Sequence, residues 1–171
     1  YSLIISELPP PPTGSVLLVD ENFSSGLPGD WAVDTSSGIS WTINTPVPGD
    51  SRLDNLTGGQ GDFAMVDNDF IHQTVTSLET PEFDLSSATA VVLRFNSYFA
   101  MDTGESINVD ISTDGGSSWS NVWPWMGFNP EPAAYVLDLS AQATGQSRVS
   151  LRFRFNSEYE TQGNLWQIDN V

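Results

Sequence analysis

The apolar and polar residues of this chain alternate most regularly at positions 148–155. Every second residue is apolar and the residues between are polar, in the order Arg148, Val149, Ser150, Leu151, Arg152, Phe153, Arg154 and Phe155. This period of two is typical of a strand with one face on a core and the other in solvent. Residues 91–96 and 107–111 repeat the pattern, so we predict three half-buried strands.

Shorter apolar segments bounded by Gly, Pro, Asp or Ser predict further strands. They occupy residues 16–19, 31–33, 41–43, 63–66, 135–139 and 165–171. No window keeps a period of 3.6 over ten residues, so we expect no helix longer than two turns. Many short strands separated by turns predict an all-β fold, an antiparallel β-sandwich.

A tight hairpin is predicted between residues 111 and 119. Asp114, Gly115 and Gly116 supply the residues that a turn with positive φ angles requires. Trp119 then begins a new apolar face, so we expect its ring in the core.

The N-terminal residues 1–14 differ in composition from the rest. Residues 1–7 form a short strand candidate, and four consecutive prolines at 9–12 favour a stiff polyproline II segment. We therefore expect residues 1–14 to be a linker or a docked accessory strand. Residues 15–171 are expected to form one domain.

The net charge of the chain restricts the kinds of partner that it can bind. The 171 residues include 22 acidic residues and five basic ones, all arginine, for a net charge of −17. Nucleic acid and anionic membrane surfaces are disfavoured, because both are bound through basic residues. The surplus of carboxylates suggests bound Ca²⁺, which prefers oxygen ligands. The alternative is an acidic surface that keeps the protein soluble.

Composition also bears on the cellular location. The chain has no cysteine, which excludes disulfides and thiolate zinc sites. Extracellular animal modules of this size usually carry disulfides, so an exported bacterial or archaeal protein fits better. We find no apolar run long enough to span a membrane and no visible signal peptide. The expected location is extracellular or at the cell surface.

Seven segments, in this order, resemble the bacterial cleaved adhesin or choice-of-anchor J domains, which are similar to MAM domains. They are Glu21-Asn22-Phe23 with residues 27–31, then residues 38–41, 63–69, 78–85, 111–119, 136–140 and 166–171. The resemblance implies a jelly-roll β-sandwich without catalytic activity, and a structural Ca²⁺. Asn170 departs from the pattern, because the family commonly has a second Asp there.

The expected calcium ligands follow from the resemblance. The first and last strands of a jelly roll tend to run side by side, which would bring Glu21 near Asp169. Asp67 and Asp69 could complete an oxygen cage with backbone carbonyls. The reserve ligands are Asp50, Asp54 and Asp102. The alternative is that all of these carboxylates face water.

An aromatic cluster follows the hairpin. Trp123, Trp125 and Phe128 surround a proline and a glycine in what the pattern indicates is a loop. Exposed rings on such a loop stack on sugar faces, so they are candidates for glycan binding. The alternative is that they cap one end of the core. Tyr98 and Asp102 form a second candidate binding loop.

Catalysis has little support in the sequence. His72 is the only histidine, and no nucleophile-elbow sequence accompanies it. Glu158 and Glu160 are spaced for one face of an extended segment, but a surface loop is the simpler interpretation. We therefore expect a protein that is not an enzyme.

Three functions remain as hypotheses. The first is a Ca²⁺-stabilised adhesion module that anchors a larger exported protein to a cell surface, a matrix protein or a polysaccharide. The second is a carbohydrate-binding module that uses Trp123 and Trp125. The third is a structural subunit that polymerises when residues 1–7 add to a neighbour's sheet.

Overall fold

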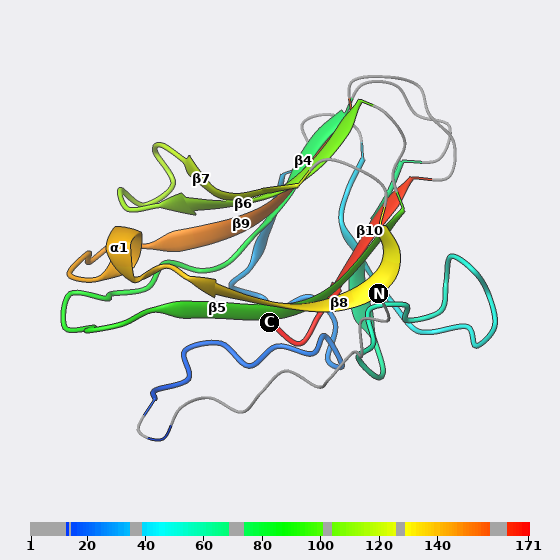
Figure 1. The fold of residues 1–171 in the computed structure, drawn as a ribbon, viewed down its shortest axis with the longest axis horizontal. Coiled ribbons are helices and arrows are strands. Elements are labelled where there is room, and N and C mark those ends of the chain that lie inside the picture. The colour runs from blue at the N-terminus through cyan, green and yellow to red at the C-terminus, as the bar shows by residue number, and fades with distance from the viewer. Residues whose placement is uncertain are drawn as a thin grey trace.

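Two antiparallel sheets of five strands each face one another in the computed structural model (Figure 1). The structure describes residues 13, 15–34, 39–68, 74–100, 104–125, 129–157 and 164–171. The first sheet has the order β1 (Ala32–Asp34), β4 (Thr74–Glu79), β9 (Ser150–Ser157), β6 (Glu105–Ser112) and β7 (Ser120–Trp125). The second has the order β2 (Thr42–Asn44), β3 (Phe63–Asp67), β10 (Leu165–Asp169), β5 (Val92–Ala100) and β8 (Asn129–Asp138). One turn of helix, α1 (Ser140–Ala143), follows β8. The prediction of an antiparallel sandwich is confirmed.

The core lies between the sheets and consists of the inward half of each alternating strand. Phe153 and Phe155 of β9 are fully buried, as is Phe95 of β5, and the Phe95 and Phe153 ring centroids are 5.2 Å apart. Trp166 of β10 packs edge-on against Phe153 at 5.9 Å. Burial of each large apolar side chain contributes about 1.5–3 kcal/mol, so this interior dominates the stability of the sandwich.

The segment before β1 is not the strand that its apolar residues predict. No strand forms at residues 16–19, and Val16, Leu17 and Leu18 are mostly exposed. Apolar composition alone does not supply a neighbouring strand to complete the ladder. The pairing begins later, where the Glu21 and Val171 backbones exchange two N–H···O bonds of 2.9 Å.

The turn between β6 and β7 has the predicted chemistry. Gly115 and Gly116 have φ angles of 70° and 82°. The Asp114 carboxylate accepts hydrogen bonds from the Ser118 amide and hydroxyl and from the Ser112 hydroxyl. The Ser118 hydroxyl is the main cause that lowers the pKa of Asp114 to about 2, so the carboxylate stays charged and holds the turn.

A β-bulge in β7 sets the orientation of the tryptophans. Asp110 of β6 is opposite Asn121, but the preceding Val109 is opposite Trp123, so Val122 is an extra residue. One extra residue shifts the alternation by one position. Trp123 therefore faces the core. Trp119, before the bulge, lies on the outer side of the sheet, and the expectation that Trp119 is a core residue is wrong.

Candidate functional sites

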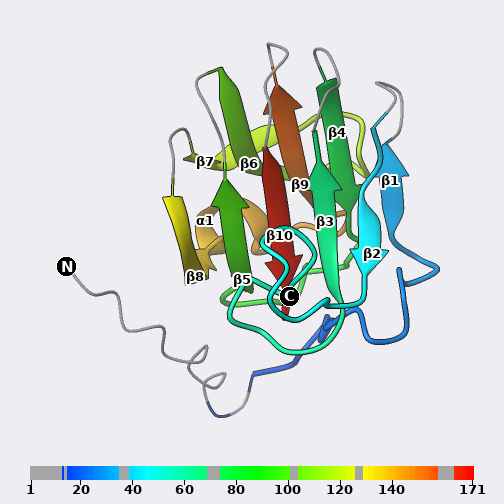
Figure 2. The ribbon, with the colours of Figure 1, turned by 90° about the vertical axis from the view of Figure 1, so that its right-hand side faces the viewer.

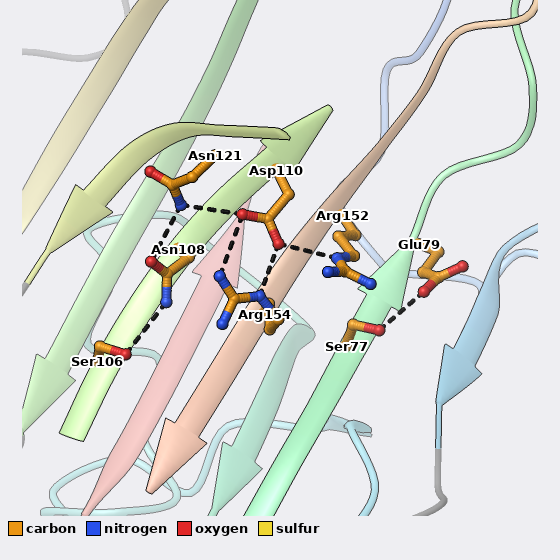
Figure 3. Close-up of polar contacts among 8 residues, drawn as sticks. All are labelled: Ser77, Glu79, Ser106, Asn108, Asp110, Asn121, Arg152 and Arg154. Carbon is orange, nitrogen blue, oxygen red and sulfur yellow. Dashed lines mark hydrogen bonds and ion pairs between the residues drawn. The ribbon is translucent and has the colours of Figure 1, made fainter. Parts of the chain in front are cut away.

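The outer side of the first sheet carries ordered rows of polar side chains (Figure 3). Strand register places Arg152 of β9 between Glu79 of β4 and Asp110 of β6, and Asn121 of β7 follows Asp110. We call eight outward residues the polar face: Ser77, Glu79, Ser106, Asn108, Asp110, Asn121, Arg152 and Arg154. Because their strands are held on the inner side by the core, their backbone positions are fixed.

Asp110 is the centre of the polar face. Its Oδ2 accepts hydrogen bonds from Arg152 Nε at 2.9 Å and from Arg154 Nε at 2.6 Å, and Arg154 Nη2 donates to Oδ1 at 3.2 Å. The Asp110 side chain is only 2% exposed, against 22% and 24% for the two arginines. Burial by itself would raise the pKa of Asp110. The hydrogen bonds from Arg154, Arg152 and Asn121 outweigh that effect and keep this pKa below its ordinary value.

Amide side chains extend the network on one side of Asp110, and a separate pair, Ser77 and Glu79, lies on β4. Asn121 Nδ2 donates to Asp110 Oδ1 at 2.9 Å and to Asn108 Oδ1 at 3.0 Å. Asn108 Nδ2 in turn donates to Ser106 Oγ at 3.2 Å, and the Ser77 hydroxyl donates to Glu79 Oε1 at 2.8 Å (Figure 3). These side chains are therefore held in place by one another.

Trp119 lies beside this network. The Arg152 guanidinium carbon is 4.4 Å from the centre of the Trp119 ring, a cation–π contact. The sequence identified the tryptophan but not its position. The signal that could have revealed the site is the polar half of the alternation in residues 148–155, which places Arg152 and Arg154 on one outer face.

The aromatic residues predicted to bind ligand are placed differently. Trp123 contacts Tyr135 and Phe95, with ring centroids 4.7 Å and 5.7 Å away, and Trp125 contacts Phe99 at 5.6 Å. Both tryptophans belong to a strand rather than a loop and pack against the core. They close the side of the sandwich between β7 and β8, as the alternative interpretation expected, and they do not form an exposed stacking platform.

Tyr98, the other predicted ligand-binding residue that the structure describes, does not join Trp125. Tyr98 is opposite Gln167 on the outer side of the second sheet, whereas Trp125 faces inward. Phe128 and Asp102 lie outside the described residues, and so do His72, Glu158 and Glu160.

A second candidate site lies on the outer side of the second sheet, where the loop of residues 45–62 crosses β10 (Figure 2). Gln167 of β10 accepts a hydrogen bond from the Leu56 amide at 2.9 Å and donates to the carbonyls of Arg52 and Asp54. Farther along β10, Asn55 Nδ2 donates to Asp169 Oδ2 at 2.9 Å. The loop therefore covers the outward side chains of this strand.

Asp169 is a fully buried carboxylate in an acidic environment. Burial is the main cause that raises the pKa of Asp169 to about 6, and the negative charges of Glu21 and Asp62 raise it further. Hydrogen bonds from Asn55 and the Asn170 amide only partly compensate. Gly59 lies so close that a Cβ atom there would be 2.0 Å from Asp169 Oδ2. The site combines concentrated negative charge with little space for a protein side chain.

Two features beside Asp169 match an oxygen-rich ion site. Asn96 is opposite Asp169 in the register of β5 and β10, and its buried Oδ1 has no hydrogen-bond partner among the described residues. The non-glycine residues with positive φ in the described part of the chain, Phe23 at 57° and Asn170 at 51°, both flank the Glu21–Val171 pairing. Such backbone strain tends to concentrate at functional sites.

The structure brings together only part of the predicted calcium set. Glu21 and Asp169 are neighbours, as the resemblance implied. Asp67 is opposite Leu165, four residues before Asp169, which places it about 13 Å away along the sheet. There it forms an ion pair with Arg52, with 2.5 Å between Nη2 and Oδ1. Asp69 lies outside the described residues.

The structure describes two of the three reserve calcium ligands, Asp50 and Asp54. Asp50 accepts hydrogen bonds from backbone amides of its own turn, and Asp54 accepts the Gly49 amide. Asp102 is not among the described residues.

The sequence does not predict Asp62 as a ligand, because only the folding of its loop onto β10 brings it near Asp169. No group of three or more acidic or histidine side chains in the described ranges is arranged to hold a metal alone. A cation here would also need amide or carbonyl oxygens.

Comparison with known proteins identifies the fold. No family model matches the sequence, and no curated protein matches it. Among solved structures, the K1 cleaved adhesin domain of Lys-gingipain from Porphyromonas gingivalis W83 has a TM-score of 0.62 at 16% identity, covering 88% of this chain and 94% of that domain. The K3 domain of the same protein has a TM-score of 0.61 at 18% identity, with 90% and 96% covered.

A carbohydrate-binding structure is also similar. TmCBM61, solved in complex with β-1,4-galactotriose, has a TM-score of 0.53 at 17% identity and covers 88% of this chain and 91% of its own. The resemblance to cleaved adhesin domains is thus confirmed in the fold. No helix in the described residues is long and apolar enough to cross a membrane.

Proposed function

We propose that this chain is a non-catalytic, Ca²⁺-stabilised binding module that attaches a larger exported protein to a cell surface, a matrix protein or a glycan. The observation that carries the proposal is the fold, which matches adhesin and carbohydrate-binding domains over nearly the whole of both chains. A stiff sandwich that presents fixed polar side chains suits recognition without chemistry. Its place of action is extracellular or at the cell surface.

Attachment is tested with the purified chain fused to a fluorescent protein. We expect retention on at least one of three surfaces: bacterial cells, immobilised matrix proteins or immobilised polysaccharides. The fluorescent protein alone is the control. Equal retention of the fusion and the control on every surface would contradict a binding function.

We include Ca²⁺ in the proposal because the buried Asp169 carboxylate and its surroundings suit a divalent cation. The residues that would hold the ion are Asp169 and Glu21 through carboxylates and Asn96 through its unpartnered Oδ1, with Asp62 adding negative charge. Oxygen ligands of this kind suit Ca²⁺. The ion would neutralise a buried charge and connect the first and last paired segments of the domain, so its contribution is to stability.

Calorimetric titration with Ca²⁺ tests this part. Asp169→Asn should weaken binding at least tenfold, because it removes a buried charged ligand. Asp67→Asn is the matched control: it also removes one Asp from the second sheet, but at the end where Asp67 pairs with Arg52. Binding that Asp169→Asn leaves unchanged, or that Asp67→Asn abolishes, would exclude the site.

A further inference from the structure

We propose that the polar face binds a neutral polysaccharide. Sugar hydroxyl groups would exchange hydrogen bonds with Arg152, Arg154 and Asn121, and a sugar ring would lie against Trp119. This inference rests on the proposed binding function. It names the ligand class and the surface, and it replaces Trp123 and Trp125 as the site of glycan contact.

The polar face is ordered before any ligand arrives. Asp110 is held by both arginines and by Asn121, and Asn121 is also bonded to Asn108. Ordering a long side chain on binding costs about 0.5–1.5 kcal/mol. Because these side chains are already fixed by one another, most of that cost falls in folding rather than in binding.

The side chains of the polar face keep hydrogen-bonding capacity for a ligand. A guanidinium carries five N–H donors. Asp110 takes one donor from Arg152 and two from Arg154, and both arginine side chains are about a quarter exposed. The Glu79 carboxylate accepts a hydrogen bond from Ser77 and has lone pairs beyond it. Donors and acceptors close together are what vicinal sugar hydroxyls require.

The composition and charge of the polar face indicate the kind of partner that it fits. Protein interfaces concentrate their binding energy in buried aromatic, apolar and arginine side chains, and the polar face has two arginines but no apolar residue. Its two arginines are balanced by Asp110 and Glu79, so the face has little net charge. The whole protein carries −17 and repels polyanions. A neutral chain of hydroxyl groups fits these conditions better than an apolar protein surface or an acidic polymer.

The dimensions agree with this assignment. Glu79, Arg152, Asp110 and Asn121 form a row across four adjacent strands. Neighbouring strands are about 4.8 Å apart, so the row spans about 14 Å, the length of a short oligosaccharide segment. Trp119 beside Arg152 adds an aromatic surface of the kind on which pyranose faces stack.

Affinity electrophoresis and calorimetry of the whole chain test the inference. The neutral probes are β-1,4-galactan, β-1,4-xylan and β-1,3-glucan, and the anionic probes are polygalacturonate and heparin. We expect binding to at least one neutral polysaccharide. Arg154→Gln and Trp119→Ala should each weaken that binding tenfold or more. Arg148→Gln is the matched control, because it removes an arginine paired with Glu82 outside the polar face, and it should leave affinity unchanged.

The outcomes separate this inference from the proposed function. Urea denaturation of each variant establishes that it is folded, and Asn121→Ala, at an exposed position, provides a milder variant expected to weaken binding. Neutral-glycan binding that persists in Arg154→Gln, Trp119→Ala and Asn121→Ala would overturn the inference but keep the binding function. A preference for the anionic probes would overturn it too. Attachment to cells or matrix protein without any glycan binding would retain only the proposed function.

Discussion

At the scale of single residues, Asp169 is a carboxylate that the fold shields from water. Its pKa of about 6 exceeds the ordinary value of 3.8, so the folded protein holds this proton more tightly than the unfolded chain does. The stabilisation from the protonated form is complete below about pH 4 and is lost as the pH rises to about 6. Glu21 and Asp62 strengthen the effect. Asp169 is therefore expected to make the calcium-free domain less stable to unfolding at neutral pH than at about pH 4.

This expectation is tested by comparing the native protein with the Asp169→Asn variant. In the presence of a chelator, the free energy of unfolding of the native protein should fall between about pH 4 and pH 7, relative to the variant, by on the order of 3 kcal/mol. The comparison is needed because Asp50, Asp84, Asp110, Asp114 and Asp138 have lowered pKa values and act in the opposite direction. Urea denaturation at several pH values measures it, and parallel curves would contradict it.

Gly59 tests the packing of the same site. Substitution by Ala places a Cβ 2.0 Å from Asp169 Oδ2 and 2.8 Å from Asn170 Nδ2, so the loop must move away from β10. We expect a loss of about 1–3 kcal/mol in the free energy of unfolding, and weaker Ca²⁺ binding. Gly29→Ala is the control, because nothing lies within 4 Å of its added Cβ. Equal stability of the two variants would show that the loop is not in close contact with Asp169.

At the scale of elements, the extra residue Val122 determines which side chains of β7 face the core. It shifts the alternation so that Trp123 and Trp125 close the core while Asn121 and Trp119 remain outside. An unbulged strand would expose Trp123 on the same side as Asn121. The bulge thus gives one short hairpin two roles, one in packing and one on the polar face.

The two tryptophans should respond differently to truncation. Trp123→Ala removes ring contacts with Phe95, Trp125 and Tyr135 and should cost about 3 kcal/mol of stability. Trp119→Ala removes a surface cation–π contact and should cost about 1 kcal/mol or less. Urea denaturation of the two variants measures both values. A larger loss for Trp119→Ala would contradict the assigned orientations.

The same hairpin shows how far the sequence predicts this fold. The alternation in β9 and the turn at Asp114 were predictable, because each is a local signal. A single extra residue in β7 leaves no such signal, so the sequence predicts Trp119 in the core and leaves the orientation of Trp123 and Trp125 open. β4 was missed because two of its buried positions, Thr74 and Thr76, are polar and conceal the alternation. Asp62 and Gly59 approach Asp169 only through tertiary folding of a loop.

At the scale of the whole molecule, charge opposes compaction. Five arginines cannot pair with 22 carboxylates, and two of the five share the single carboxylate of Asp110. The remaining negative charges repel one another, and the folded state brings them closer together than the unfolded chain does. Monovalent salt shortens the range of this repulsion, from about 14 Å at 0.05 M to about 4 Å at 0.5 M. Salt should therefore raise the melting temperature.

Divalent ions distinguish general screening from a specific site. At matched ionic strength, Ca²⁺ should raise the melting temperature further than Na⁺ does, because it binds the folded state at Asp169. Mg²⁺ should resemble Na⁺, since it gives up its water reluctantly and suits a buried, irregular set of oxygens poorly. Differential scanning calorimetry of the native protein and Asp169→Asn measures these shifts. The variant should keep the response to Na⁺ and lose the additional response to Ca²⁺. Equal effects of Ca²⁺ and Mg²⁺, or an additional Ca²⁺ response that survives in the variant, would attribute the stabilisation to the acidic surface as a whole.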